Sequence, residues 1–306
     1  MNASRGKNSF SDKVVVVTGA GSGIGKAIAK AFASRRADLA LADVDPDALE
    51  RVREELRAYG VRVFAQVVDV SVAPQVEHFC ENVYREFGRV DVLCNNAGVS
   101  VGGLFEDISL EDWEWILGVN LRGVVNGCHY FYPRMVEQGA GHIVNISSGL
   151  ALAPLPGSVP YCTTKYGIVG FSETLRAEAA RHNIGVTVIC PGFILTNIFR
   201  SSRQRTFVPG ETHEASVVRT EKLLARRRYD AEKVAEKVVE AVEKNRGVVP
   251  LCWEVHLGDA FHRISRGLYG KALLCLARAW YGRGGMSGEM RARDDTCPDH
   301  SRPVGE

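Results

Sequence analysis

The sequence lacks the features that mark secreted, metal-binding and nucleic-acid-binding proteins. Its eight cysteines, spread over 306 residues, form no Cys-x-x-Cys pair and no Cys/His cluster at metal-ligand spacing. We therefore expect free thiols in a reducing compartment, and no metal site. The formal net charge of only +2 gives no electrostatic reason to expect nucleic acid as a partner.

Long apolar runs are missing as well. The first thirteen residues, MNASRGKNSFSDK, are polar and lack the apolar core of a signal peptide. No apolar run reaches the roughly 18 residues that a membrane span needs. These absences predict a cytoplasmic protein. Apolar residues at 45% and charged residues at 24% are ordinary for a globular chain.

What the sequence does contain is a regular alternation of strand-like and helix-like segments. Helical patterns cover 24–37, 46–59, the stretch from an N-cap at Ser71 to Phe87, 111–138, the stretch after Pro160, and 230–245. Apolar runs between them predict seven strands at 14–18, 39–43, 61–69, 90–98, 142–148, 185–192 and 247–251. Near-continuous apolar strands alternating with helices predict an α/β fold with a doubly wound parallel sheet covered on both faces.

The run YCTTK places a phenol and an ammonium four residues apart, at Tyr161 and Lys165. If this run forms the first turn of a helix, both side chains share one face. A nearby cation would lower the tyrosine pKa from its usual value of about 10, so that the phenol could act as a general acid or base. An isolated pair at this spacing is more often a surface lysine on an ordinary amphipathic helix.

The first strand ends in TGAGSGIG, residues 18–25. Glycines at a strand-to-helix turn let the backbone approach a pyrophosphate at the N-terminus of the following helix. Asp43 ends the next strand, at about the 20-residue distance of the dinucleotide fingerprint. Its carboxylate can bind both hydroxyls of an adenosine ribose and would repel a 2′-phosphate. The alternative is a tight turn without a ligand.

These motifs, taken in order, resemble the short-chain dehydrogenase/reductase family. The resemblance covers residues 13 to about 200, more weakly to about 251, and rests on TGAGSGIG, NNAG at 95–98, Asn120, NISS at 145–148, YCTTK and PGFILT at 191–196. It implies one Rossmann-type domain with a seven-stranded sheet, a nicotinamide cofactor and a homodimer or homotetramer. We expect a flexible extension at 1–12, a catalytic domain at 13–251 with a substrate lid at 197–228, a helical extension at 252–290 and a disordered tail at 291–306.

The resemblance also implies four catalytic residues. Tyr161 would be the general acid/base, and Lys165 would lower its pKa and hold the nicotinamide ribose. Ser148, thirteen residues before Tyr161, would bind the substrate oxygen, with Ser147 as its rival. Asn120 would hold a water in the proton relay. Thr163 and Thr164 depart from the Ala-Ser pair that the family often has before its lysine.

The cofactor residues that the resemblance implies come from every motif. They are Gly19, Ser22, Gly23, Ile24, Gly25, Asp43, Asp69, Val70, Asn95, Ala97, Gly98, Tyr161, Lys165, Pro191, Gly192, Ile194 and Thr196. Asp43, with Val44 and Ser22 in place of basic residues, favours NAD over NADP. An NADPH-dependent carbonyl reductase is the alternative enzyme, and a dinucleotide-sensing protein without turnover is the alternative class.

The substrate is predicted to be a hydrophobic alcohol or ketone, because the residues expected around the pocket are apolar: Val99, Val101, Leu150, Leu152, Pro154 and Leu155. The alternative is that these residues only pack the core. Sterol, retinoid, fatty acyl and terpenoid alcohols all fit this description. Arginines in the lid could hold an anionic group, although a solvated loop is the simpler interpretation.

A segment near the C-terminus, LYGKALLCLARAWYGR at 268–283, is apolar on most faces and carries a basic flank. It is too short to span a bilayer. Such a helix needs a partner, which could be the pocket mouth, another subunit or a membrane interface. Family analogy favours subunit docking or pocket covering over peripheral membrane contact.

Overall fold

The computed structural model describes residues 9–194, 198, 202–204, 218 and 229–281, with only the backbone for Gln204 and 279–281. Residues 1–8, Thr196, most of the predicted lid at 197–228 and the tail at 291–306 lie outside this description.

Seven strands of the described chain form one parallel sheet in the order β3-β2-β1-β4-β6-β7-β9. This confirms the predicted seven-stranded α/β fold. The chain runs outward from β1 to β3 and then returns to place β4 on the other side of β1, so the topological switch lies between β1 and β4. The strands are β1 (Val14–Thr18), β2 (Asp38–Asp43), β3 (Val63–Val67), β4 (Val92–Asn95), β6 (Gly141–Ile146), β7 (Ile184–Cys190) and β9 (Val248–Pro250).

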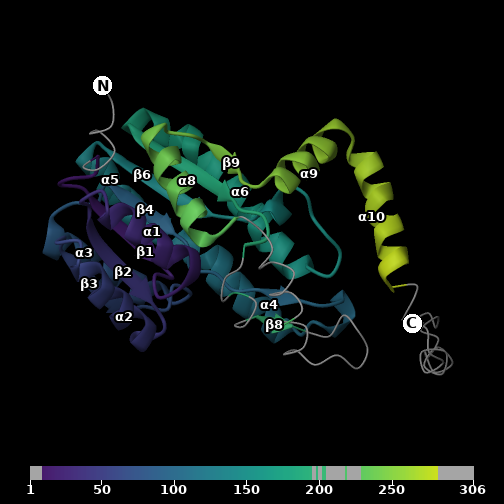
Figure 1. The fold of residues 1–306 in the computed structure, drawn as a ribbon, viewed down its shortest axis with the longest axis horizontal. Helices are drawn as coiled ribbons and strands as arrows, with labels where there is room; N and C mark the ends of the chain where they lie inside the picture. Colours follow the sequence, from purple (N-terminus) through teal and green to yellow (C-terminus); the bar gives the residue numbers. More distant parts are fainter. Residues whose placement is uncertain (1–8, 195–197, 199–201, 205–217, 219–228, 282–306) are drawn as a thin grey trace, which may run out of the picture.

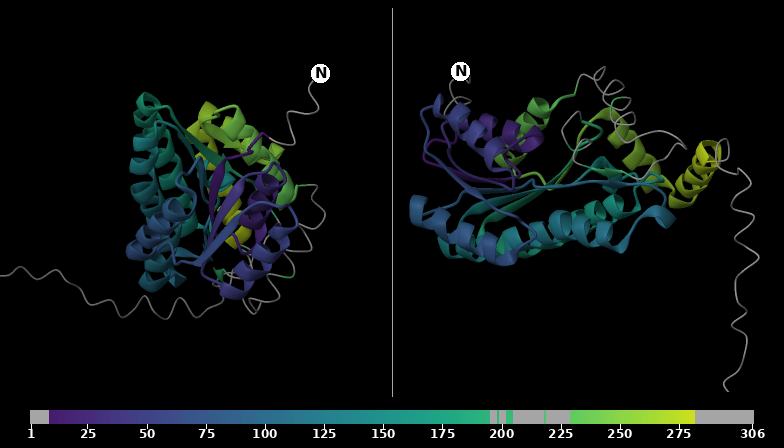
Figure 2. Two further views of the ribbon diagram at one scale, coloured as in Figure 1. Left: turned by 90° about the vertical axis from the view of Figure 1, so that its left-hand side faces the viewer. Right: turned by 90° about the horizontal axis from the view of Figure 1, so that it is seen from below.

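Helices cover both faces of the sheet, as Figures 1 and 2 show. On one face lie α1 (Gly23–Ala33), α2 (Pro46–Arg57) and α8 (Ala231–Glu243), and on the other lie α3 (Ala73–Phe87), α5 (Gly123–Gln138) and α6 (Val159–Ala179). The strands have apolar residues on both faces because both are covered. In β1, for example, Val15 and Val17 pack in the first core and Val14 and Val16 in the second.

Three local features differ from the predictions. Ser71 does not cap α3, which begins at Ala73 with Val72 at its N-cap. The Ser71 hydroxyl instead donates to the Asp69 carboxylate at 2.7 Å, a short-range turn contact that competes with capping. The helix predicted at 111–138 is interrupted, with α4 (Leu110–Ile116) and α5 separated by a π-helical segment at Leu117–Arg122. A small parallel pair, β5 (Val101–Gly102) with β8 (Arg203–Gln204), was not predicted, because strands of two residues give no periodic signal.

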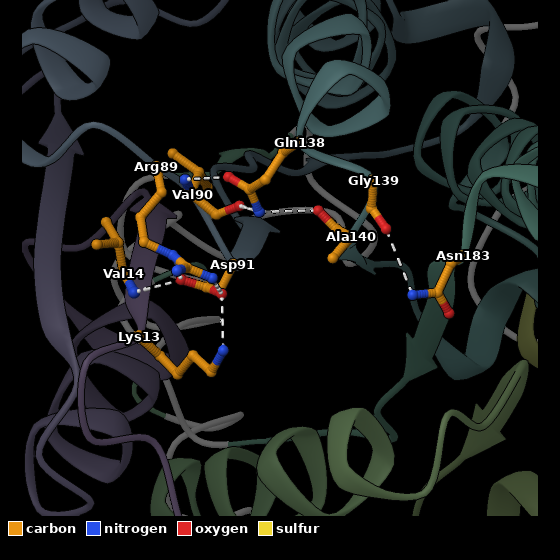
Figure 3. Close-up of polar contacts among 9 residues, drawn as sticks. All are labelled: Lys13, Val14, Arg89, Val90, Asp91, Gln138, Gly139, Ala140 and Asn183. Carbon is orange, nitrogen blue, oxygen red and sulfur yellow. Dashed lines mark hydrogen bonds and ion pairs between the residues drawn. The ribbon is translucent and has the colours of Figure 1, made fainter.

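The amino edge of the sheet carries polar groups that are paired with one another (Figure 3). The Asp91 carboxylate accepts hydrogen bonds from the Val14 amide at 3.0 Å, from Lys13 at 3.1 Å and from Arg89 at 2.6 and 2.9 Å. The Gln138 amide bridges the backbone of Val90 and Ala140. These contacts tie the starts of β1 and β4 to the end of α5.

Two helices follow β9, namely α9 (Trp253–Ile264) and α10 (Arg266–Tyr281). Helix α9 packs against the carboxyl end of the sheet, while α10 projects from one end of the molecule in Figure 1 and in the right view of Figure 2. No helix in the described ranges is both long and apolar enough to cross a bilayer.

Candidate active site

A cavity of about 870 Å³ opens at the carboxyl edge of the sheet, over the switch between β1 and β4. This is where doubly wound folds bind ligands. Fifteen of the predicted site residues line it: Gly19, Ser22, Gly23, Ile24, Asp43, Asp69, Val70, Ala97, Gly98, Ser148, Tyr161, Lys165, Pro191, Gly192 and Ile194.

The turn between β1 and α1 is shaped to receive an anionic group. Gly19 has φ +64°, and a Cβ there would lie 2.7 Å from the Ala97 Cα, so only glycine fits this approach. Ser22, at the N-cap of α1, makes no side-chain capping bond, and the first turn holds no acidic residue. The amides of that turn therefore face the cavity without a competing side chain, as a pyrophosphate would require.

The Asp43 carboxylate lies at the same end of the cavity. One oxygen accepts from the Gly21 amide at 2.7 Å and the other from the Asp45 amide at 3.0 Å. These bonds fix the carboxylate beside the glycine turn, where it could accept hydrogen bonds from ribose hydroxyls. Arg51, on α2, also lines this end.

Tyr161 lies in the first turn of α6, where its side chain is half-buried and its hydroxyl is hydrogen-bonded to Ser148. Burial raises the pKa of Tyr161 to about 12, and the bond to Ser148 lowers it by a smaller amount. The lowering of this pKa by Lys165 stays a prediction, because in the protein alone burial outweighs the effect of the neighbouring groups. Loss of solvent disfavours the phenolate more than its neighbours stabilise it.

Lys165 shares the helix face with Tyr161, as the spacing predicts. Its Nζ lies 5.6 Å from the centre of the Tyr161 ring and donates to the Ile146 carbonyl at 3.0 Å. The residue is only 3% exposed. Burial lowers the pKa of Lys165 to about 8, so its charge is costly in the absence of an anionic partner.

The two serines that end β6 have different partners. The Ser147 hydroxyl donates to the Lys165 carbonyl at 2.8 Å, and this bond links the end of β6 to α6. The Ser148 hydroxyl accepts from the Leu150 amide at 3.2 Å and reaches Tyr161. This arrangement leaves Ser148, rather than Ser147, beside the phenol.

Three of the predicted catalytic and cofactor residues that the structure describes lie outside the cavity lining, and each contacts the backbone or core around it. Asn120 sits in the π-helical segment; its amide contacts the Val99 amide and carbonyl at 2.8 and 2.9 Å and Thr164 at 3.2 Å. A Cβ on Gly25 would meet the Gly19 carbonyl at 2.0 Å, so this glycine allows close packing of the turn.

Asn95 is the third of these residues outside the cavity lining. Its neighbour Asn96 lines the cavity instead. The Asn95 amide is buried against Asn145 at 2.9 Å. Asn96 lines the cavity and donates to the carbonyls of Thr18 and Gly19 at 2.9 and 3.0 Å. The sequence alone could have suggested this shift, because the side chains of adjacent strand residues point to opposite faces.

The far end of the cavity is mainly apolar. Of the residues predicted there, Val99, Leu150 and Leu155 line it, whereas Val101 and Leu152 are buried and Pro154 lies outside the lining. Residues missed by the sequence analysis also line the cavity, among them the charged Glu254 and also Trp115, Phe193, Val255, Gly258 and Tyr269. The last three come from α9 and α10, which are fastened by Tyr269 Oη to the Pro154 carbonyl at 2.8 Å.

Comparison with known proteins places the chain in a family. A model of the short chain dehydrogenase family matches residues 13–206. The probable oxidoreductase EphD of Mycobacterium tuberculosis is 42% identical over 268 residues, which are 86% of this chain and 44% of that protein. This chain therefore spans less than half the length of that relative. D-threitol dehydrogenase of Mycolicibacterium smegmatis is 39% identical over 186 residues, 61% of this chain and 72% of that enzyme.

Solved structures agree. A short chain dehydrogenase/reductase from Burkholderia phymatum, crystallised in complex with NAD, is 36% identical with a TM-score of 0.73, covering 79% of this chain and 89% of that one. Levodione reductase is 30% identical with a TM-score of 0.70, covering 79% of this chain and 96% of that one. By its motifs, its fold and these matches, the chain belongs to the short-chain dehydrogenase family.

Proposed function

We propose that the protein transfers a hydride between a nicotinamide dinucleotide, NAD in preference to NADP, and a hydrophobic alcohol or ketone. The observation that carries this proposal is the Tyr161 phenol, which is hydrogen-bonded to Ser148 in the cavity and has Lys165 on the same helix face. A protein that only senses a dinucleotide would have little use for these three groups together.

The chain's own residues would bind, orient and move a proton. The amides at the start of α1 would hold the pyrophosphate, and Asp43 would hold the adenosine ribose. When bound, the nicotinamide supplies the hydride chemistry. The Ser148 hydroxyl would orient the substrate oxygen, and the Tyr161 hydroxyl would exchange a proton with it. The Lys165 ammonium would hold the nicotinamide ribose and favour the phenolate.

The apolar end of the cavity supports a hydrophobic substrate. Leu155, Val255 and Tyr269 face the space beyond Tyr161 from three different segments of the chain. Glu254 is a charged side chain that α9 also brings to the cavity, but a sugar or polyol would need more partners than this for hydroxyls that otherwise lose their hydrogen bonds to water.

The choice of cofactor has a specific rival. Asp43 would repel a 2′-phosphate, but Arg51 lines the same end of the cavity and could pair with one. An NADPH-dependent carbonyl reductase is therefore the second candidate. The similarity to EphD and to D-threitol dehydrogenase does not distinguish an NAD-dependent from an NADPH-dependent enzyme.

A substrate screen tests the proposal. The full chain would be incubated with NAD or NADP and a panel of hydrophobic alcohols, or with NADH or NADPH and the matching ketones, while the absorbance of the reduced cofactor is followed. We expect turnover with NAD and at least one apolar alcohol, and none with polyols. Binding of cofactor without turnover on any member of the panel would favour the sensor function instead.

A further inference from the structure

The outer face of α9 carries a stripe of large apolar side chains. Trp253, Leu257, Phe261 and Ile264 follow one another at intervals of four, four and three residues, which places them on one side of the helix. Their exposed fractions are 73%, 62%, 41% and 82%. We call these four residues the α9 stripe. Val255 and Gly258 line the cavity from the other side of the helix.

Helix α10 exposes apolar side chains as well. Leu268, Leu274 and Leu276 are exposed on it, and the helix lies at one end of the molecule in Figure 1 and in the right view of Figure 2. Seven of the seventeen large apolar side chains that are exposed in the described chain lie between Trp253 and Leu276. So dense an exposed cluster marks a contact surface rather than the scattered apolar residues of an ordinary protein exterior.

The exposed charges of α9 and α10 that have no ion-pair partner among the described residues are positive. The α9 carboxylates are engaged, since Asp259 pairs with Arg263 at 2.8 Å and Glu254 lines the cavity. Helix α10 contains no acidic residue. Its cations Arg266, Lys271 and Arg278 are exposed, and none has an ion-pair partner among the described residues.

We propose that α9 and α10 dock the protein on an anionic lipid surface. The α9 stripe would enter the boundary between headgroups and acyl chains, where tryptophan is favoured. The α10 cations would lie against lipid phosphates. Helix α10 has 16 residues, which is too short to span a bilayer, so it would lie in the membrane interface. In a two-fold dimer the surface would face its own copy, in which α10 has no carboxylate and Asp259 of α9 is already paired, so the cations would gain no partner there.

This docking would place lipid next to the cavity. Helix α9 separates the stripe from Val255 and Gly258 by one helix diameter, about 10 Å. A substrate dissolved in the bilayer would then have a short path to the apolar end of the cavity. The docking itself does not depend on the reaction proposed above.

Vesicle co-sedimentation of the full chain tests the proposal. The probes are vesicles of phosphatidylcholine alone and of phosphatidylcholine with one quarter phosphatidylserine. The first variant, Trp253→Ser/Ile264→Ser, shortens the stripe. The second, Arg266→Gln/Lys271→Gln/Arg278→Gln, removes the α10 cations. The matched control, Val72→Ser/Leu110→Ser, removes two exposed apolar side chains elsewhere on the surface. All the substituted side chains are exposed, so each variant should retain its fold, which is checked by its thermal midpoint.

We expect the unmodified protein and the control to sediment with the anionic vesicles. The stripe variant should bind at least tenfold more weakly, and the cation variant about fivefold more weakly per charge removed. Binding should also weaken in high salt. If the unmodified protein ignores both vesicles, or if the stripe variant binds as well as the control, the proposal is wrong. A dimer that binds no vesicle and dissociates in the stripe variant would assign the surface to a second copy.

Discussion

The two edges of the parallel sheet differ in what their polar side chains face. At the amino edge, the Asp91 carboxylate accepts hydrogen bonds from protein donors, and the Gln138 amide forms hydrogen bonds with three backbone groups (Figure 3). At the carboxyl edge, Asp43 and Ser148 also have protein donors, but these two residues and Tyr161 line a cavity as well. Groups whose partners are all within the protein stabilise the fold, whereas groups aimed at a cavity are available to a ligand. Substitutions at the two edges should therefore have separable effects.

Removing the Tyr161 hydroxyl should have the largest effect on activity. Tyr161→Phe keeps the ring packing and loses the transferable proton. Turnover should fall by about 100-fold or more, while the dissociation constant of NAD changes little. Steady-state kinetics beside a cofactor titration would measure both quantities, with Tyr166→Phe, an exposed tyrosine one turn further along α6, as the control. Retained turnover in Tyr161→Phe would falsify the proposed proton transfer.

Removing the Asp91 carboxylate should have the largest effect on stability. Asp91→Ala leaves the Val14 amide without its acceptor and two cations without their partner. We expect the free energy of unfolding to fall by about 2 kcal/mol, as measured by urea denaturation. The control Glu236→Ala breaks an exposed pair with Arg35 and should cost less than about 1 kcal/mol. Equal losses in the two variants would mean that the amino-edge cluster has no special role.

His142, on β6, should make stability depend on pH. Its ring contacts Thr187 at 2.8 Å, and burial, helped by Arg176, lowers its pKa to about 4. The unfolded chain takes up a proton near pH 6.5 and the folded chain only near pH 4, so stability is full above 6.5 and falls as the pH drops between these values. Between pH 6.5 and 5 the loss should be about 2 kcal/mol. In His142→Gln this slope should flatten; an unchanged slope would assign it to other groups.

Asp43 should show the smallest of these effects, and on cofactor choice alone. Asp43→Ala removes the proposed acceptor for the ribose hydroxyls, so NAD should bind about tenfold more weakly. NADP should bind better than it does to the unmodified protein. Fluorescence titration with NADH and NADPH gives both dissociation constants. If the unmodified protein already prefers NADPH, Arg51 outweighs Asp43, and Arg51→Gln should reverse that preference.

The sequence predicted the sheet and most of the cavity because their signals are local. Apolar runs mark strands buried on both faces, and the spacing of Tyr161 and Lys165 is enough to put them on one helix face. It failed where the outcome depends on packing between distant segments. The pKa of Tyr161 is raised because several segments exclude water from it. Val255 and Tyr269 reach the cavity only because α9 folds back over the sheet.

One measurement tests most directly whether the two edges have separate roles in stability and catalysis. It is turnover per folded molecule on a single apolar alcohol. It would be made on the unmodified protein, Tyr161→Phe and Asp91→Ala, with the folded fraction taken from the unfolding curve of each. We expect Asp91→Ala to match the unmodified protein and Tyr161→Phe to fall by about 100-fold or more. Equal turnover in the two variants, or a larger loss in Asp91→Ala, would contradict the assignment of catalysis to the carboxyl edge.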